Sequence, residues 1–353
     1  MLPLGDSIMK NKTNPETFKD FLKRKQVHIT PKVYLIDTLG AMAFGLFASL
    51  LIGTIFQTLG EKTGIASFLM IAGYAKGATG AALGVSIAHA LKAPNLVLFS
   101  AATVGIAGNE LGGPVGALVA TILAVELGKI VSKETRVDIL VTPGVTINAG
   151  VLAAQFVGPG VSRFMNFFGT LVKTATEMQP FFMGILVSAL IGIALTLPIS
   201  SAAICIMLSL DGIAGGAATA GCCAQMIGFA IMSFKENSWG GLLAQGLGTS
   251  MLQIPNIVKN PKIWIPSILT SMITGPISTC IFRLENIPAG AGMGTCGLVG
   301  PIGVITAMPD GGVKMWIGIL LVCFILPGLL SYIFCEIFRK IGWIKEGDLK
   351  IDL

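Results

Sequence analysis

Between about residues 36 and 338 the chain is an almost continuous series of apolar segments, and this pattern limits its possible folds more than any other feature. Several segments reach the roughly 20 residues that a helix needs to cross a hydrocarbon layer of about 30 Å. Charged residues make up 12% of the chain and the mean hydropathy is +0.81, whereas soluble proteins carry about 25% charged residues. We therefore predict an all-α polytopic membrane protein that binds the lipid bilayer along most of its length.

The apolar segments differ in length and in regularity. We place them at about 36–58, 66–91, 95–108, 112–131, 139–158, 179–198, 199–210, 213–233, 239–255, 263–282, 289–308 and 315–338. The pieces 95–108 and 199–210 are too short to span, and TPGVTINAG (142–150) and IPAGAGMGTCGLVGPIG (287–303) carry Gly and Pro, which disfavour a helix. Irregular backbone at membrane depth is tolerated only where it is buried in protein or lines a wet cavity. The sequence thus predicts roughly ten spans, with re-entrant or broken helices along a solute pathway.

Two pairs of segments repeat at a constant offset of 139 residues. FGLFASLLIG (44–53) resembles MGILVSALIG (183–192), and GYAKGATGA (73–81) resembles GIAGGAATA (212–220). Chance similarity between Gly-rich apolar segments is the alternative to duplication. Duplicated halves are common in transporters, where solute binds between interrupted helices. We predict two homologous, inverted halves, and divide the chain into a basic arm (1–35), two membrane repeats (36–175 and 176–345) and a tail (346–353).

The N-terminal arm is basic and amphipathic. Thr13 and Glu16 form a potential capping box, after which Phe18, Phe21 and Leu22 share one helical face. Such a helix is expected to lie on the cytoplasmic leaflet, and no helix-turn-helix partner for binding nucleic acid is present. No cleavable signal peptide is visible, and lysines and arginines flank the first and last spans. Both termini are therefore expected in the cytoplasm.

Few ionisable residues fall inside the apolar segments, where each is a functional candidate by default. Lys76 lies in the middle of 66–91, and Glu110 lies between two apolar segments. The two could instead form a structural ion pair with each other. For Glu126 and His89 an interfacial contact is the simpler interpretation.

Polar side chains also interrupt the Gly-rich segments. These candidates for solute binding are Thr142, Thr146 and Asn148 in the first segment, Gly294 and Thr295 in the second, and Asn109 beside Glu110. Glycine lets backbone amides approach a ligand, and the N-termini of half-helices favour hydroxyls or anions. A polyhydroxy or anionic solute would suit such a site, although each glycine could equally permit a close helix crossing.

Motifs for soluble catalysis are missing from the sequence. The seven cysteines lie in or beside apolar stretches without metal-ligand spacing, and we expect them to pack as small hydrophobes. No Walker motif, nucleophile elbow, zincin motif or dinucleotide fingerprint is present. We expect no metal, no cofactor and no catalytic residue in the chain itself.

Four segments together carry a family resemblance: LVTPGVTINAG (140–150), VGPGVSRFMNFFG (157–169), SSAAICIMLSLDGIAGGAATAGC (200–222) and NIPAGAGMGTCGLVGPIG (286–303). The chain resembles the enzyme IIC-like permeases of the bacterial phosphoenolpyruvate-dependent sugar phosphotransferase system, in particular a short stand-alone subgroup. The resemblance implies a bacterial plasma membrane, a sugar-like solute, separate IIA and IIB proteins as partners, and a homodimer. No fused IIA or IIB region and no cytosolic phosphorylation motif is visible.

Two other functions stay open from the sequence. One is a secondary transporter or channel independent of phosphorylation, for which Glu110 is the best titratable group, and the other is a membrane-bound sensor that signals through the basic arm 10–32. For the dimer contact we favour the bulky apolar spans 179–198 or 315–338, which contain Phe181, Phe182, Trp316 and Phe324.

Overall fold

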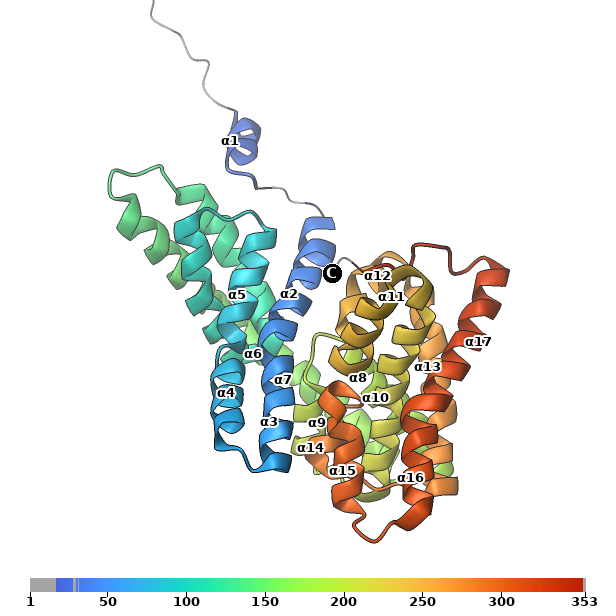
Figure 1. Ribbon diagram of the computed structural model, residues 1–353. Coiled ribbons are helices and arrows are strands. Elements are labelled where there is room, and N and C mark those ends of the chain that lie inside the picture. The colour runs from blue at the N-terminus through green and yellow to red at the C-terminus, as the bar shows by residue number, and fades with distance from the viewer. Residues whose placement is uncertain (1–16, 28–29, 31, 352–353) are drawn as a thin grey trace, which may run out of the picture.

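The computed structural model describes residues 17–27, 30 and 32–351, and the part of the chain it describes is helical throughout, with one isolated β-bridge between Gly212 and Asn286. The helices form two lobes (Figure 1). The first lobe contains α2 to α7 and the second contains α8 to α17. The predicted capping box at Thr13 and Glu16 lies outside the described residues, whereas the amphipathic segment after it is helical.

The arm and first lobe comprise α1 (Phe18–Arg24), η1 (Lys32–Asp37), α2 (Thr38–Leu46), η2 (Phe47–Leu51), α3 (Ile52–Thr63), α4 (Ala66–Gly77), α5 (Thr79–Ala90), α6 (Asn95–Val131) and α7 (Asp138–Thr176), where η marks short π- or 3-10-helical pieces. The second lobe comprises α8 (Pro180–Thr196), α9 (Ser201–Met207), α10 (Gly212–Met232), α11 (Phe234–Leu243), η3 (Ala244–Gly248), η4 (Ser250–Gln253), α12 (Ile254–Lys259), η5 (Pro261–Trp264), α13 (Ile265–Pro276), η6 (Ile277–Phe282), α14 (Pro288–Ala291), η7 (Cys296–Leu298), α15 (Val299–Ala307), α16 (Gly312–Leu320), η8 (Leu321–Ile325) and α17 (Leu326–Ile341).

Six helical stretches among the described residues are long and apolar enough to cross a membrane, and α4 with α5 makes a seventh if this bent pair is one span. The predicted all-helical, multi-pass fold is confirmed at this level. α8 and the stretch Cys296–Ala307 are apolar but shorter. The predicted number of roughly ten crossings therefore stays a prediction.

The 37-residue helix α6 is in fact a hairpin of two arms. Its backbone leaves the helical region at Gly112 and Gly113, immediately before Pro114. A Cβ placed on Gly108 would lie 2.7 Å from the Cα of Ala117, whereas residues nine apart in a straight helix are about 13 Å apart. The arms thus fold back on each other, and the predicted break between 95–108 and 112–131 is confirmed.

The prediction that Gly and Pro break the segment TPGVTINAG is wrong, because this segment lies inside the continuous helix α7. Pro143 removes one backbone donor there, but Thr146 adds a side-chain hydrogen bond to the Thr142 carbonyl. Neighbouring helices and threonine side chains commonly allow proline within membrane helices. Gly150 lies against Val104 and Ala124, one from each arm of the α6 hairpin, so that α7 packs into the groove between the arms.

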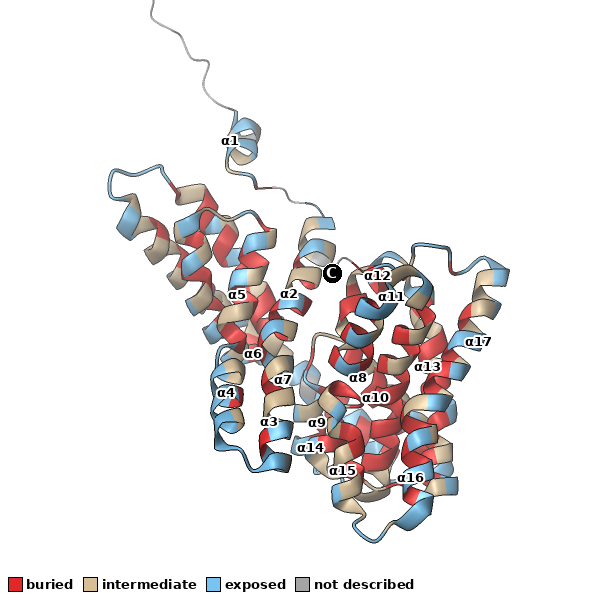
Figure 2. Cartoon of the chain, in the orientation of Figure 1, coloured by how far each residue is buried: buried red, intermediate tan, exposed pale blue. Residues whose placement is uncertain are grey.

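The far end of α7 joins the two lobes. Phe168, Val172 and Ala175 are buried in one core cluster with Val187 and Ile191 of α8. α10 runs through the centre of the second lobe and is buried along nearly all of its length (Figure 2). α7 therefore connects the first lobe to the α8–α10 core.

Close helix contacts through glycine occur within the chain. A Cβ on Gly80 would lie 2.7 Å from the Cα of Ile106, and Gly84 lies directly against the Ala101 carbonyl. Gly80 and Gly84 thus allow α5 to pack closely on α6. Gly45 lies against Ala82 and Ser86, whereas its proposed repeat partner Gly184 lies against Gly275 and Thr279. Positions paired by the offset of 139 residues meet different partners here, and the duplication stays a prediction.

The C-terminal tail is fixed to the second lobe by hydrogen bonds. The Leu349 carbonyl accepts from Asn237 Nδ2 at 2.8 Å and from Gln253 Nε2 at 2.9 Å, and Asn256 Nδ2 donates to the Lys350 carbonyl at 2.7 Å. Leu349 is fully buried. The tail thus holds α11, η4 and α12 together.

The arm is fixed to the loop after α6 by charges. Glu134 accepts from Arg24 at 3.0 Å, and its carboxylate lies 2.5 Å from Lys25 Nζ. Hydrogen bonds from Lys25 and Arg24 hold the pKa of the Glu134 carboxyl below its usual value. This contact therefore persists to a lower pH than it would with a glutamate of ordinary pKa.

α3 and α4 form a tight antiparallel hairpin whose spacing depends on Gly53. A Cβ at Gly53 would lie 2.5 Å from Cγ and 3.1 Å from the backbone nitrogen of Lys76. Gly73, on the same helix α4, has nothing within 4 Å of the equivalent position. The two glycines therefore offer a matched pair of substitutions.

We expect Gly53→Ala to destabilise the protein by about 1–3 kcal/mol, because the new methyl group overpacks the hairpin. Gly73→Ala should instead stabilise it by up to about 1 kcal/mol, because alanine favours an open helical position. The midpoint of thermal unfolding in detergent measures both effects. Equal shifts in the two variants would contradict the close α3–α4 contact.

Candidate functional site

A cavity of about 570 Å³ lies between the two lobes. The first lobe contributes α2, α3, α4 and Pro114 at the tip of the α6 hairpin. The second lobe contributes the ends of α8 and α9, the turn between η3 and η4, and the broken segment from α14 to α15. Most lining residues are apolar, with a few polar side chains among them, which is usual for sites that bind small molecules.

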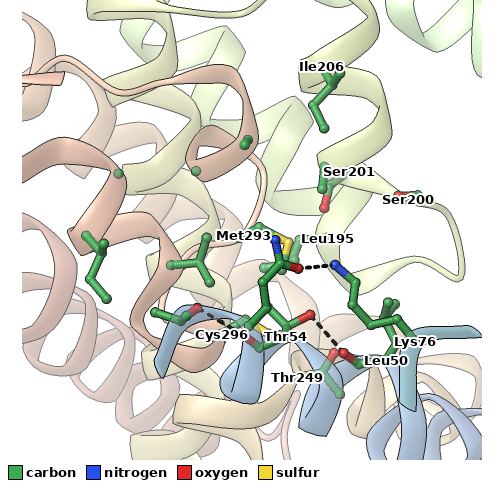
Figure 3. A pocket seen from close by; sticks show the side chains of 18 of the residues that line it. Leu50, Thr54, Lys76, Leu195, Ser200, Ser201, Ile206, Thr249, Met293 and Cys296 are labelled. Carbon is green, nitrogen blue, oxygen red and sulfur yellow. Dashed lines mark hydrogen bonds between the residues drawn. The ribbon is translucent and has the colours of Figure 1, made fainter. Parts of the chain in front are cut away.

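Three polar side chains of the first lobe form a chain in this cavity. Lys76 Nζ donates to Gln57 Oε1 at 2.5 Å, and Gln57 Nε2 donates to Glu61 Oε1 at 2.7 Å. Lys76 points from the first lobe toward Leu195, Ser201 and Met293 of the second (Figure 3). Lys76 and Glu61 are the charged residues that line the cavity.

Lys76 occupies the last turn of α4, where the chain bends by 46° before α5. A cation is favoured at this C-terminal end of a half-helix. Thr79 Oγ1 donates to the Lys76 carbonyl at 2.7 Å and so adds a side-chain hydrogen bond at the bend. Gly53 gives the lysine side chain room to pass α3 and reach the cavity.

The opposite wall is a broken segment held by hydrogen bonds. Asn286 Nδ2 donates to Thr219 Oγ1 at 2.6 Å and to the Gly300 carbonyl at 3.0 Å, and its Oδ1 accepts from the Ile287 amide. Ser201 Oγ donates to the Gly292 carbonyl at 2.7 Å. The predicted break at 287–303 is confirmed, and these bonds satisfy the polar backbone that the break exposes.

Most hydroxyl groups lining the cavity already donate their hydrogen to backbone carbonyls. Thr54 donates to Leu50, Thr58 to Thr54, and Thr306 to Ile302. Ser200 and Thr249 differ, because their hydroxyl oxygens accept from the Ala203 and Met251 amides and keep their own hydrogens available. The uncommitted donors in the cavity are therefore concentrated at Lys76, Ser200 and Thr249.

A smaller cavity of about 290 Å³ adjoins the first. Pro114, Ile199 and Ser200 line both cavities. Glu110 lines the smaller one, beside the Gly112–Gly113 break of the α6 hairpin. Among the described residues no ion pair joins Glu110 to Lys76, and the two groups belong to neighbouring cavities.

The residues predicted from sequence lie in the larger cavity, in the smaller cavity or outside both. Lys76 and Glu110 line the cavities, whereas Asn109, Thr142, Thr146, Asn148, Gly294 and Thr295 line neither. Thr142 donates to Asp138 at 2.6 Å near the start of α7, and Asn148 bonds the Gly144 carbonyl of its own helix. Thr295 lies between the lining residues Met293 and Cys296 and donates to the Gly246 carbonyl at 2.5 Å. A role in solute binding stays a prediction for these six residues.

Three polar residues of the cavity were missed from the sequence. Gln57 and Glu61 lie at the polar end of the first apolar segment, where polar residues indicate only that a membrane span ends. Their i, i+4 spacing places them on one helical face, but only the pairing of α3 with α4 in the structure shows that this face lies toward Lys76. Ser200 belongs to the short piece 199–210, which was recognised as broken without this residue being singled out.

Comparison with known proteins supports the resemblance drawn from sequence. The family described as "Phosphotransferase system, EIIC" matches residues 36–351. No curated protein and no solved structure matches the chain. The family match runs from the first apolar segment to the C-terminal tail and so includes both lobes and every wall of the cavity. The chain therefore belongs to the EIIC family of the phosphotransferase system, the membrane permeases of enzyme IIC type.

Proposed function

We propose that this membrane permease moves a small hydrophilic solute, a sugar or a related polar compound, through the cavity between its lobes. The observation that carries the proposal is the Lys76–Gln57–Glu61 chain, which places two charged groups on the wall of a mostly apolar cavity. Ionisable groups at membrane depth are costly and mark solute pathways. Lys76, Gln57 and Ser200 bind the solute, and Glu61 lies beside them.

Transport by alternating access follows from how the cavity is built. One wall belongs to the first lobe and the other to the broken helices of the second. Transporters commonly bind solute between such interrupted elements and expose it to either side when one part moves against the other. Movement of the α3–α4 hairpin relative to α14 and α15 opens and closes the cavity.

Membership of the EIIC family implies association with separate IIA and IIB components. The partner proteins supply the phosphoryl group, because no catalytic motif is visible in this chain. IIB docks on the cytoplasmic side, where both termini are proposed to lie. Uptake of the solute is then coupled to its phosphorylation.

Locking the lobes together should stop transport. A Cβ at Gly297 would lie 3.6 Å from the Cα of Ile55 across the two lobes, and disulfides join Cβ atoms about 3.5–4.5 Å apart. In a Cys296→Ser background, we expect oxidised Ile55→Cys/Gly297→Cys protein to lose uptake by cells and to regain it on reduction. The two single variants are the controls, and they also reveal any strain from a side chain at Gly297, whose φ is +51°. Undiminished uptake by the cross-linked protein would contradict movement at this contact.

A gradient-driven transporter is the second candidate, favoured by Glu110 in the adjoining cavity. Vesicles that contain the permease without IIA and IIB separate the two functions. The phosphotransferase proposal predicts no concentrative uptake in these vesicles under an imposed proton or sodium gradient. Concentrative uptake that is abolished by Glu110→Gln would establish the second candidate instead.

We also propose that the permease is a homodimer joined through bulky apolar spans. Phe181, Phe182 and Trp316 are 52%, 52% and 57% exposed in the single chain, and aromatic side chains supply large contact areas. Light scattering of the detergent-solubilised protein should give twice the chain mass. Phe181→Ala/Phe182→Ala should shift it toward the monomer, and a monomer at every concentration of the unaltered protein would refute the dimer.

A further inference from the structure

We infer that the solute is a hydroxy acid whose carboxylate or other acid group binds Lys76, with its hydroxyl groups directed toward Glu61. This inference rests on the proposed function, because it names the chemical class of solute for the same cavity. It depends on the hydrogen bonds that the cavity residues have already made and on the donors that remain unused.

Lys76 brings a positive charge into the cavity without a carboxylate to neutralise it directly. In the part of the chain that the structure describes, its hydrogen-bond partner is the neutral Gln57 and no carboxylate lies within ion-pair distance. An ammonium group has three donors, so two of them remain for a ligand. A charge removed from water is stabilised best by an opposite charge with good hydrogen bonds. An acid group on the solute supplies both.

The other donors favour the same kind of solute. Thr54, Thr58 and Thr306 donate to backbone carbonyls, and Ser201 donates to Gly292. What remains for a ligand is the Lys76 ammonium and the hydroxyls of Ser200 and Thr249. This end of the cavity therefore suits a solute with many hydrogen-bond acceptors. It does not suit a solute that can only donate hydrogen bonds.

Glu61 determines which way an acidic solute is oriented in the cavity. Its carboxylate binds Gln57 Nε2, and Gln57 stands between it and Lys76. The remaining lone pairs of Glu61 accept hydrogen bonds from hydroxyl groups and repel a second acid group. A molecule with an acid at one end and hydroxyls at the other satisfies both residues. A volume of about 570 Å³ falls within the usual range for small-molecule sites and has room for a six-carbon acid.

Binding to the purified full-length protein in detergent tests the inference with matched pairs of probes. Each neutral sugar is paired with one or two acids of the same carbon skeleton: glucose with glucuronate and gluconate, galactose with galacturonate and galactonate, and mannose with mannuronate. We expect at least one acid to bind at least tenfold more tightly than its neutral partner, as measured by the concentration dependence of thermal stabilisation. A phospholipid headgroup carries the same anionic chemistry, so phosphatidylglycerol is titrated as a separate arm, both alone and in competition with the acids.

Substitutions assign the preference to Lys76. Lys76→Met should reduce the ratio of acid to neutral affinity at least tenfold, Lys76→Arg should retain most of it, and Glu61→Gln should increase it. Lys314→Met makes the same change of charge on the exposed surface of α16, where no ion pair or hydrogen bond of this side chain is seen, and should leave the ratio unchanged.

Several results would overturn the inference. A neutral sugar that binds as tightly as its acid, or an acid preference that survives Lys76→Met, leaves the permease function in place but removes the acid solute. Phosphatidylglycerol that binds through Lys76 while no soluble acid competes identifies a lipid site in place of the solute site. If no probe of either kind binds and no uptake occurs, both the inference and the proposed function are wrong.

Discussion

The fold depends on one constraint, which is that every backbone N–H and C=O group inside a membrane needs a hydrogen-bond partner from the protein. Regular helices meet this need internally, and broken helices meet it only where other parts of the protein cover the break. The break between α14 and α15 is covered in this way by Asn286 and Ser201, which donate to the carbonyls of Gly300 and Gly292. Thr79 Oγ1 adds a side-chain hydrogen bond to the Lys76 carbonyl at the bend between α4 and α5.

These covered breaks meet around the cavity. The bend after Lys76, the tip of the α6 hairpin at Pro114, the short helix α9 and the broken segment 287–303 all contribute to its walls. Each break frees side chains and backbone from the regular helical pattern, so that polar groups can face one another in the middle of an apolar protein. Glycine makes the breaks compatible with close packing, since Gly53 lets α4 approach α3 while Lys76 reaches past it.

Sequence reasoning could identify the class of fold but only part of the site. Lys76 could be recognised because a lysine inside an apolar segment has a high free-energy cost and is therefore a functional candidate. Gln57 and Glu61 could not, because their partner depends on how α3 and α4 pair, which the hydropathy pattern does not contain. The assignment of TPGVTINAG as a break failed for a different reason. Proline and glycine preferences measured in water are weak guides where neighbouring helices and threonine hydroxyls support the backbone, as around Pro143.

The two walls of the cavity differ in how firmly they are held. The second lobe's wall is tied by buried hydrogen bonds from Asn286 and Thr295, and η4, beside the lining residue Thr249, is tied to the C-terminal tail through Gln253. The α3–α4 hairpin has fewer such bonds and exposes Met70 and Tyr74 at 58% and 74%. Elements with few buried contacts open at the lowest free-energy cost. Lys76 belongs to this less constrained wall, so in the proposed transport mechanism it is the α3–α4 wall that moves toward the second lobe when a solute binds.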